Sequence, residues 1–136
     1  MSASNIAVLD SSVCMRLRTC RLLLDLGLKA VPFDRMDDLL AALATGRQFQ
    51  MLVLTLDGDT GNALKNGSFA VADTPMMLLF NQEPVEMVAL VMESEHNDFM
   101  QSPFSNTELR DRLHSLYLRS GQETTLDRPP QPVSND

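Results

Sequence analysis

The sequence of 136 residues is poor in cysteine, and this shortage excludes two kinds of site. Its two cysteines, Cys14 and Cys20, fall in one predicted helix and point to different faces, so we expect no disulfide between them. No C-x-x-C or Cys/His spacing is typical of a zinc site, and we expect no metal or cofactor to be held in this way. Reduced thiols in a reducing compartment fit this pattern.

Basic residues and long apolar runs are also scarce. Lys and Arg number 11 against 18 Asp and Glu, and the formal net charge is −7. Because phosphate contacts need clustered Lys and Arg, we expect no direct nucleic-acid binding by this domain. No apolar run approaches the roughly 20 residues that span a bilayer, and no signal peptide is recognisable. We therefore expect a cytoplasmic protein without membrane contact.

The chain does contain short apolar runs that alternate with helical patterns, and its hydrophobic share of 44% fits one folded domain. The predicted strands are 6–9, 29–33, 51–54, 75–80 and 98–101. The predicted helices run from 12 to about 26, 34–43, 84–92 and 105 to about 119, with at most a short helix at 62–65. Strands that are apolar throughout and alternate with helices predict a doubly wound α/β fold, a parallel sheet covered on both faces.

Capping signals support these helix boundaries. Gly27 is predicted to end the first helix and Asp34 to cap the second, and Ser105 and Glu108 form a predicted capping box for the last one. From residue 121 the chain is polar and carries three prolines, so we expect a domain over 1–120 and a Pro-rich linker or disordered tail over 121–136. We expect this tail to lead toward an output domain.

Residues at the carboxyl ends of the strands should line any working crevice of such a sheet. These are Asp10, Thr55, Phe80 and the pair Gln101-Ser102. Asp10 is either a remnant metal ligand or a cap for the first helix, and the sequence leaves both open.

Several fragments, in this order and spacing, resemble receiver domains of two-component response regulators over about residues 5–119. They are Leu9-Asp10-Ser11-Ser12, Met15-Arg16, Leu26-Gly27, Ser102-Pro103-Phe104 and Glu108-Leu109. The resemblance implies a flavodoxin-like, five-stranded sheet in the order 2-1-3-4-5 with about five helices. It also makes Ser102–Pro103 a candidate for a cis peptide bond.

The resemblance also implies a phosphoacceptor pocket, and here the pocket is degenerate. Receivers hold Mg²⁺ on acidic residues, phosphorylate an aspartate and use a lysine and a hydroxyl to bind the phosphoryl group. In this chain Asp10 keeps one acidic position and Ser11 replaces the other, while Thr55 occupies the acceptor position. Phe80 replaces the switch hydroxyl and Ser102 the lysine. We predict no phosphoryl chemistry, no metal and no enzymatic activity.

Two features qualify this prediction. Phe99 matches the aromatic residue that receivers place on the fifth strand and turn inward on activation. Phosphorylation at Asp10, Asp57 or Asp59 is the alternative, although acids beside glycines in a loop are usually turn residues.

The first predicted helix carries two apolar stripes on nearly opposite sides, and a core can cover only one of them. One stripe consists of Met15, Thr19, Leu22, Leu23 and Leu26, and the other of Val13, Leu17, Cys20 and Leu24. The second stripe is a candidate interface with a partner or a second copy, against the alternative that single exposed apolar residues carry no meaning. Arg110, Asp111 and Arg112 on the last helix form a second candidate interface, because receivers often dimerise through this surface.

These features predict a phosphorylation-independent regulatory module of an atypical response regulator. It would act as a homodimer, through contacts with an output domain, or with a sensor or regulator protein. In this family the output is most often DNA binding, which suggests transcription regulation by analogy. The alternatives are a stand-alone adaptor and a flavodoxin-like ligand-binding domain. The latter is disfavoured because Asp10-Ser11-Ser12 has no glycine for a phosphate loop.

Overall fold

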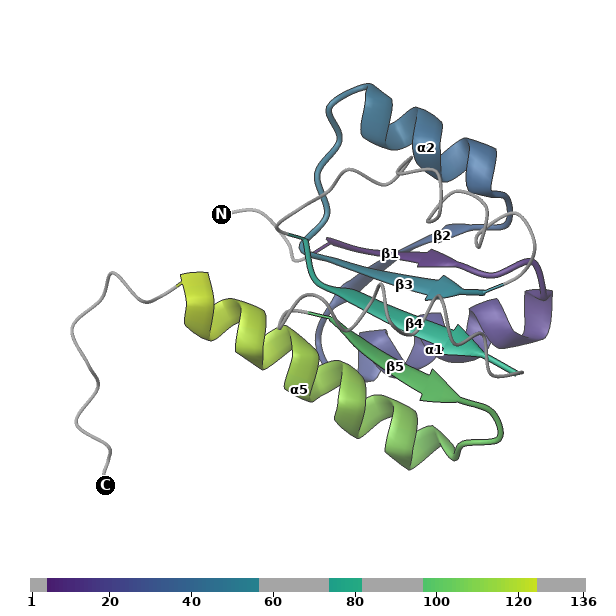
Figure 1. The fold of residues 1–136 in the computed structure, drawn as a ribbon, viewed down its shortest axis with the longest axis vertical. Coiled ribbons are helices and arrows are strands. Elements are labelled where there is room, and N and C mark those ends of the chain that lie inside the picture. The colour runs from purple at the N-terminus through teal and green to yellow at the C-terminus, as the bar shows by residue number, and fades with distance from the viewer. Residues whose placement is uncertain (1–4, 57–73, 82–96, 125–136) are drawn as a thin grey trace.

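Five short apolar strands pair in parallel, in the order β2-β1-β3-β4-β5. The computed structural model describes residues 5–56, 74–81 and 97–124. The strands are β1 (Asn5–Leu9), β2 (Lys29–Phe33), β3 (Met51–Thr55), β4 (Met76–Phe80) and β5 (Asp98–Gln101). In Figure 1 their arrows point in one direction, so their carboxyl ends share one edge of the sheet. The predicted doubly wound sheet and its strand order are confirmed.

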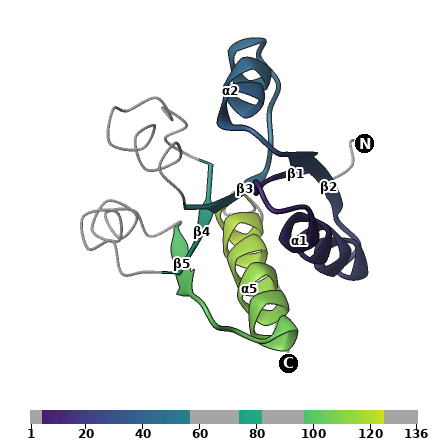
Figure 2. The same ribbon diagram turned by 90° about the vertical axis from the view of Figure 1, so that its right-hand side faces the viewer.

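Three helices of the described residues cover the two faces of this sheet. They are α1 (Val13–Asp25), α2 (Met36–Ala44) and α5 (Asn106–Thr124). Figure 2 shows α1 and α5 together on one face and α2 on the other. The predicted helices at 62–65 and 84–92, and residues 125–136 of the predicted tail, lie outside the described residues.

Strand side chains alternate between two buried layers, one on each face. The layer under α1 and α5 contains Ile6, Val8, Met51, Val53, Met77, Leu79 and Met100, packed against leucines of both helices. The layer under α2 contains Ala7, Leu9, Leu52, Leu54 and Leu78. Both faces of the central strands are therefore buried, which explains why these strands are apolar throughout.

Glycine ends α1 as the sequence predicted. Gly27 has φ of +82°, a conformation that side chains with a Cβ rarely adopt. Its N–H donates to the carbonyl of Leu24 at 2.9 Å, and the N–H of Leu28 donates to that of Leu23 at 3.0 Å. This pair of bonds is a Schellman motif, and it turns the chain directly into β2.

The predicted cap of α2 is wrong. The cap position is Arg35, whose side chain makes no capping hydrogen bond. Asp34 lies one residue before the cap position, too far along the chain to take the place of a cap side chain at the amides of the first turn. The negative charges of Asp37 and Asp38, in that first turn, instead interact favourably with the positive end of the helix dipole and stabilise the start of α2.

The last helix begins as predicted and ends later than predicted. Ser105 Oγ accepts from the N–H of Glu108 at 3.0 Å, and Glu108 Oε1 accepts from the N–H of Ser105 at 2.9 Å, which confirms the capping box. The helix continues past Arg119 to Thr124. Glycine at 121 weakens a helix interior by about 1 kcal/mol but does not break it as proline does, so the first part of the predicted tail is helical.

Candidate functional site: the strand-end pocket

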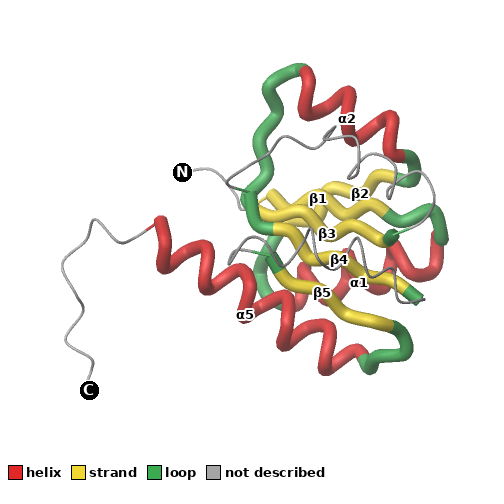
Figure 3. Tube along the Cα trace, in the orientation of Figure 1, coloured by secondary structure: helices red, strands yellow, loops and turns green. Residues whose placement is uncertain are grey.

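The register of β1 and β3 places the first two pocket residues side by side. Leu9 pairs with Leu54, so the next residue of each strand, Asp10 and Thr55, leaves the same edge at the same level. Figure 3 shows the loops after β1 and β5 leaving this shared edge. The hydroxyl Oγ1 of Thr55 donates to Oδ2 of Asp10 at 2.8 Å. Asp10 is only 5% exposed, so this bond is made by a buried carboxylate.

The other oxygen of Asp10 holds the turn into α1. Oδ1 accepts from the N–H of Ser12 at 2.9 Å, and Ser12 Oγ accepts in turn from the N–H of Met15 at 3.3 Å. The helix cap is therefore Ser12 and not Asp10. Asp10 lies two residues earlier and accepts a hydrogen bond from the N–H of the cap residue. Arg16 Nη1 donates to the backbone oxygen of Asp10 at 2.7 Å and ties the first turn of α1 to the same residue.

A divalent cation does not fit these residues. Magnesium prefers six oxygen ligands and is usually held by carboxylates. Both oxygens of Asp10 already accept hydrogen bonds, Ser11 is exposed and offers only a hydroxyl, and Thr55 directs its hydroxyl proton at Asp10. In the described ranges no group of three or more His, Cys, Asp or Glu side chains is placed to hold a metal ion.

The remaining pocket residues gather at the ends of β4 and β5. The N–H of Ser102 donates to the carbonyl of Phe80 at 2.8 Å, and the Ser102–Pro103 bond is cis, as the resemblance implied. Phe80 is 3% exposed and its ring stacks on that of Phe99, with centroids 5.9 Å apart and planes at 28°. An apolar ring therefore fills the place where the resemblance implies a hydroxyl.

The fold is that of known receiver domains. One match is a response regulator receiver domain from Methanospirillum hungatei, with a TM-score of 0.74 at 12% identity over 90% of this chain and 99% of that one. A second is the receiver domain of a protein assigned as a Luxo repressor from Vibrio parahaemolyticus, with a TM-score of 0.76 at 13% identity over 94% and 100%. A third, from an HD domain-containing protein of Pseudomonas fluorescens, has a TM-score of 0.70 at 18% identity over 89% and 99%.

The chain has the receiver-domain fold. No family model and no curated protein sequence matches the chain.

The outer face of α1 in this receiver fold is apolar, as predicted for three of the four stripe residues. Val13, Leu17 and Leu24 are 57%, 63% and 66% exposed. Cys20 is a correction, since it is half-buried and packs against the core layer shared by α1 and α5. It lies at the edge of the stripe nearest the sheet, and burial raises the pKa of its thiol, although Arg16 acts in the opposite direction. Both cysteines are free.

Arg112, predicted to lie in an interface, is bound within the receiver fold. Its guanidinium forms a bidentate pair with the carboxylate of Asp98: Nε donates to Oδ2 at 2.9 Å, and Nη2 donates to Oδ1 at 2.8 Å. Nη2 also donates to the carbonyl of Phe99 at 3.1 Å. By contrast, Arg110 and Asp111 are exposed, with 4.0 Å between Nε of Arg110 and Oδ1 of Asp111. Their place in an interface remains a prediction. No sequence signal pointed to the Asp98–Arg112 pair, because its partners are 14 residues apart on different elements.

Both side chains of this pair have shifted pKa values, because the hydrogen bond to Asp98 raises the pKa of Arg112 while the pKa of Asp98 is lowered. Burial alone would raise the pKa of the Asp98 carboxyl. The hydrogen bonds from Arg112 and from the N–H of Phe99, with the charges of Arg112 and Arg119, outweigh burial and hold the pKa below its ordinary value. The pair therefore fastens the beginning of β5 to α5.

No helix in the described residues is long and apolar enough to cross a membrane.

Proposed function

We propose that this domain is a regulatory module of an atypical two-component response regulator that acts through protein contacts and without phosphoryl transfer. The observation that carries the proposal is the hydrogen bond from Thr55 to Asp10. The residue at the acceptor position is Thr55, whose hydroxyl donates a hydrogen bond to the carboxylate of Asp10. An acyl phosphate requires a carboxylate at that position, and a threonine does not provide one.

The other pocket contacts support the same conclusion. A phosphoryl group carries negative charge that a receiver neutralises with a cation and a lysine. Here Ser102 stands at the lysine position, and Phe80 offers only a buried ring. An incoming phosphoryl group would meet the negative charge of Asp10 with a serine in place of the lysine at 102, and like charges repel in a buried site.

The surfaces then carry the function. The outer face of α1, Val13, Leu17 and Leu24, is one contact surface, and the exposed residues Arg110 and Asp111 on α5 belong to the second. We propose that these surfaces serve a homodimer, an output domain or a regulator protein in the cytoplasm. One similar receiver belongs to a protein assigned as a repressor, so transcription regulation through a DNA-binding output domain is the output we favour.

A phosphodonor experiment tests the proposal directly. The full chain is incubated with acetyl phosphate and Mg²⁺, and its intact mass is followed beside a receiver domain that has the complete set of pocket residues. We expect the control to gain one phosphoryl group and this chain to keep its mass. A phosphoryl adduct on Asp10, or on Asp57 or Asp59 outside the described residues, would overturn the proposal.

A further inference from the structure

The aromatic pair Phe80 and Phe99 lies on the α2 side of the sheet, at the end where β4 and β5 meet the pocket. Leu78 pairs with Phe99 across the two strands, and Phe80 follows Leu78 by two residues on the same side. The two rings are therefore diagonal neighbours, within the 4.5–7 Å centroid range of favourable aromatic contacts at 5.9 Å. The strand register itself produces the contact.

The backbone on both sides of the stack is fastened. On β5, the N–H of Phe99 donates to Oδ1 of Asp98 at 2.8 Å, and the carbonyl of Phe99 accepts from Arg112 at 3.1 Å. On β4, the carbonyl of Phe80 accepts from Ser102 at 2.8 Å, in addition to the ladder between the strands. Phe99 can thus change position only by rotating its side chain and not by moving its strand.

Rotation away from the stack would be costly. Phe99 would lose both its contact with Phe80 and its packing against the core layer under α2. Both losses disfavour the rotated position. A small hydroxyl residue at 80 would leave an open volume beside Phe99 in place of a second ring.

We propose that Phe80 locks Phe99 in a single position, so that the β4–β5 end of the sheet has one conformation whatever occupies the pocket. This extends the proposed function, because a module that is not phosphorylated has no use for a switch driven by the pocket. It also predicts that no conformational change at Phe99 regulates the domain.

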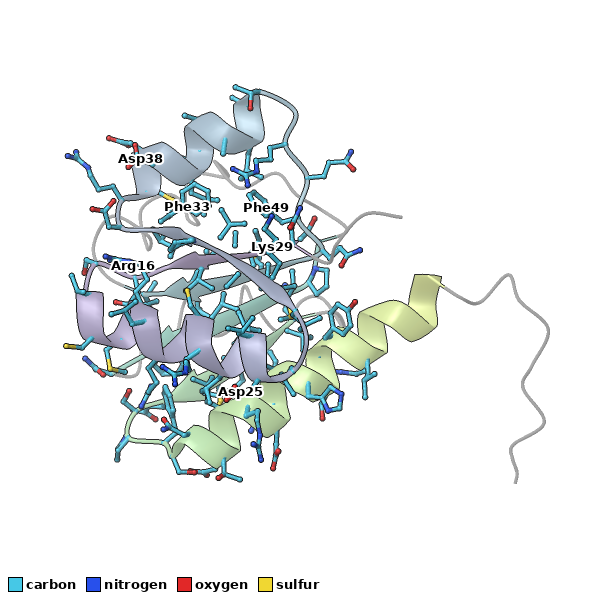
Figure 4. The ribbon with its side chains drawn as sticks, turned by 180° about the vertical axis from the view of Figure 1, so that it is seen from behind. Arg16, Asp25, Lys29, Phe33, Asp38 and Phe49 are labelled. Atoms are coloured by element: carbon cyan, nitrogen blue, oxygen red, sulfur yellow. The ribbon has the colours of Figure 1, made fainter. Side chains whose placement is uncertain are left out.

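The test measures exchange of the Phe99 ring by NMR relaxation dispersion in the full chain, with labelled phenylalanine. The chain has six phenylalanines, and a second pair provides an internal control. Phe33 and Phe49 also lie 5.9 Å apart, edge to face at 87°, and Figure 4 shows both near α2. We expect flat dispersion for Phe99 in the wild type and no shift of its signals on addition of beryllium fluoride with Mg²⁺.

The variant Phe80→Thr should release Phe99. We expect exchange of the Phe99 signals, with a rotated population at least about tenfold above that of the wild type, while Phe33 and Phe49 are unchanged. Phe80→Leu keeps apolar bulk without a ring, and we expect a smaller increase. If Phe80→Thr fails to fold, which the Phe33 and Phe49 signals reveal, Phe80→Leu and the wild-type measurement decide the matter.

The outcomes separate this inference from the proposed function. Exchange of Phe99 in the wild type, or Phe99 signals that stay sharp and unshifted in both folded variants, overturns the lock and leaves the phosphorylation result untouched. In a uniformly labelled sample, beryllium fluoride binding that shifts the backbone signals of Asp10 and Thr55 but not those of Phe99 contradicts the proposed function and supports the lock.

Discussion

The strand-end pocket and the outer face of α1 differ in how far their side chains are bonded or covered by the rest of the domain. They lie close in the sequence, since Asp10 and Val13 are three residues apart. In the pocket, both carboxylate oxygens of Asp10 accept hydrogen bonds, from Ser12 and from Thr55, and the N–H of Ser102 donates to Phe80. On α1, Val13, Leu17 and Leu24 are more than half exposed and contribute little to the core. The pocket carboxylate is therefore hydrogen-bonded within the chain, whereas the apolar side chains of α1 remain exposed.

This difference underlies our proposal that interactions with other molecules take place at α1 and not in the pocket. A site that binds a ligand keeps groups available for it, whereas the Asp10 carboxylate is occupied by its own chain. Exposed apolar side chains gathered on one helix face gain free energy only when another surface covers them. The predictions below test whether the pocket acts as structure and whether α1 acts as a surface.

The largest expected effect is a loss of stability on removing the pocket carboxylate. In Asp10→Ala, the bonds from the Thr55 hydroxyl and the Ser12 amide are lost, and Thr55 lies partly buried at the strand end. Bonds to charged groups are worth about 1.5–3 kcal/mol, reduced here by the cost of burying the carboxylate, so we expect a loss of about 1–3 kcal/mol in the free energy of unfolding. Urea denaturation measures it.

Two matched variants make this test specific. Asp34→Ala removes an exposed aspartate after β2 that does not cap α2, and Leu17→Ala removes a side chain that is 63% exposed. Both should change the free energy of unfolding by less than about 0.5 kcal/mol. The comparison between pocket and helix face breaks down if Leu17→Ala costs as much as Asp10→Ala.

A smaller, pH-dependent effect is expected at the pair formed by Asp98 and Arg112. The folded-state pKa of Asp98 lies below its ordinary value, so the stabilisation is fully present above the unfolded pKa of about 4 and is lost as the pH falls toward the lowered folded value. Arg112→Met should cost about 1 kcal/mol at neutral pH, a figure kept modest because Arg112 is 48% exposed. Below about pH 4 the difference from wild type should shrink.

Arg110→Met is the control for that pair, since Arg110 is a neighbouring arginine whose ion pair with Asp111 is long and exposed. Its stability should match the wild type within about 0.5 kcal/mol at every pH. A constant difference between Arg112→Met and wild type from neutral to acidic pH contradicts an ionic origin.

Sequence patterns located the strands and helix ends, and the resemblance to receivers implied the strand order, but neither gave the contacts of the site. Apolar runs located all five strands, and Gly27, Ser105 and Glu108 located helix ends, because each acts through its immediate neighbours along the chain. The stripe on α1 was correct except for Cys20, whose burial depends on α5 packing beside it. The Thr55–Asp10 bond joins residues 45 positions apart, and strand register decides it.

The last prediction concerns mass and has the smallest expected effect on stability. In Leu17→Glu with Leu24→Glu, two charges replace side chains that are 63% and 66% exposed, so the monomer should lose no more than about 0.5 kcal/mol per site. If α1 mediates self-association, sedimentation of the variant should show a smaller species than the wild type. A comparison variant, Arg110→Glu, reverses a charge on the α5 surface, and retention of the larger species there assigns the contact to α1. If the sedimenting species of the α1 variant has the same mass as that of the wild type, self-association through α1 is rejected. If only the α5 variant sediments as a smaller species, the contact lies on α5.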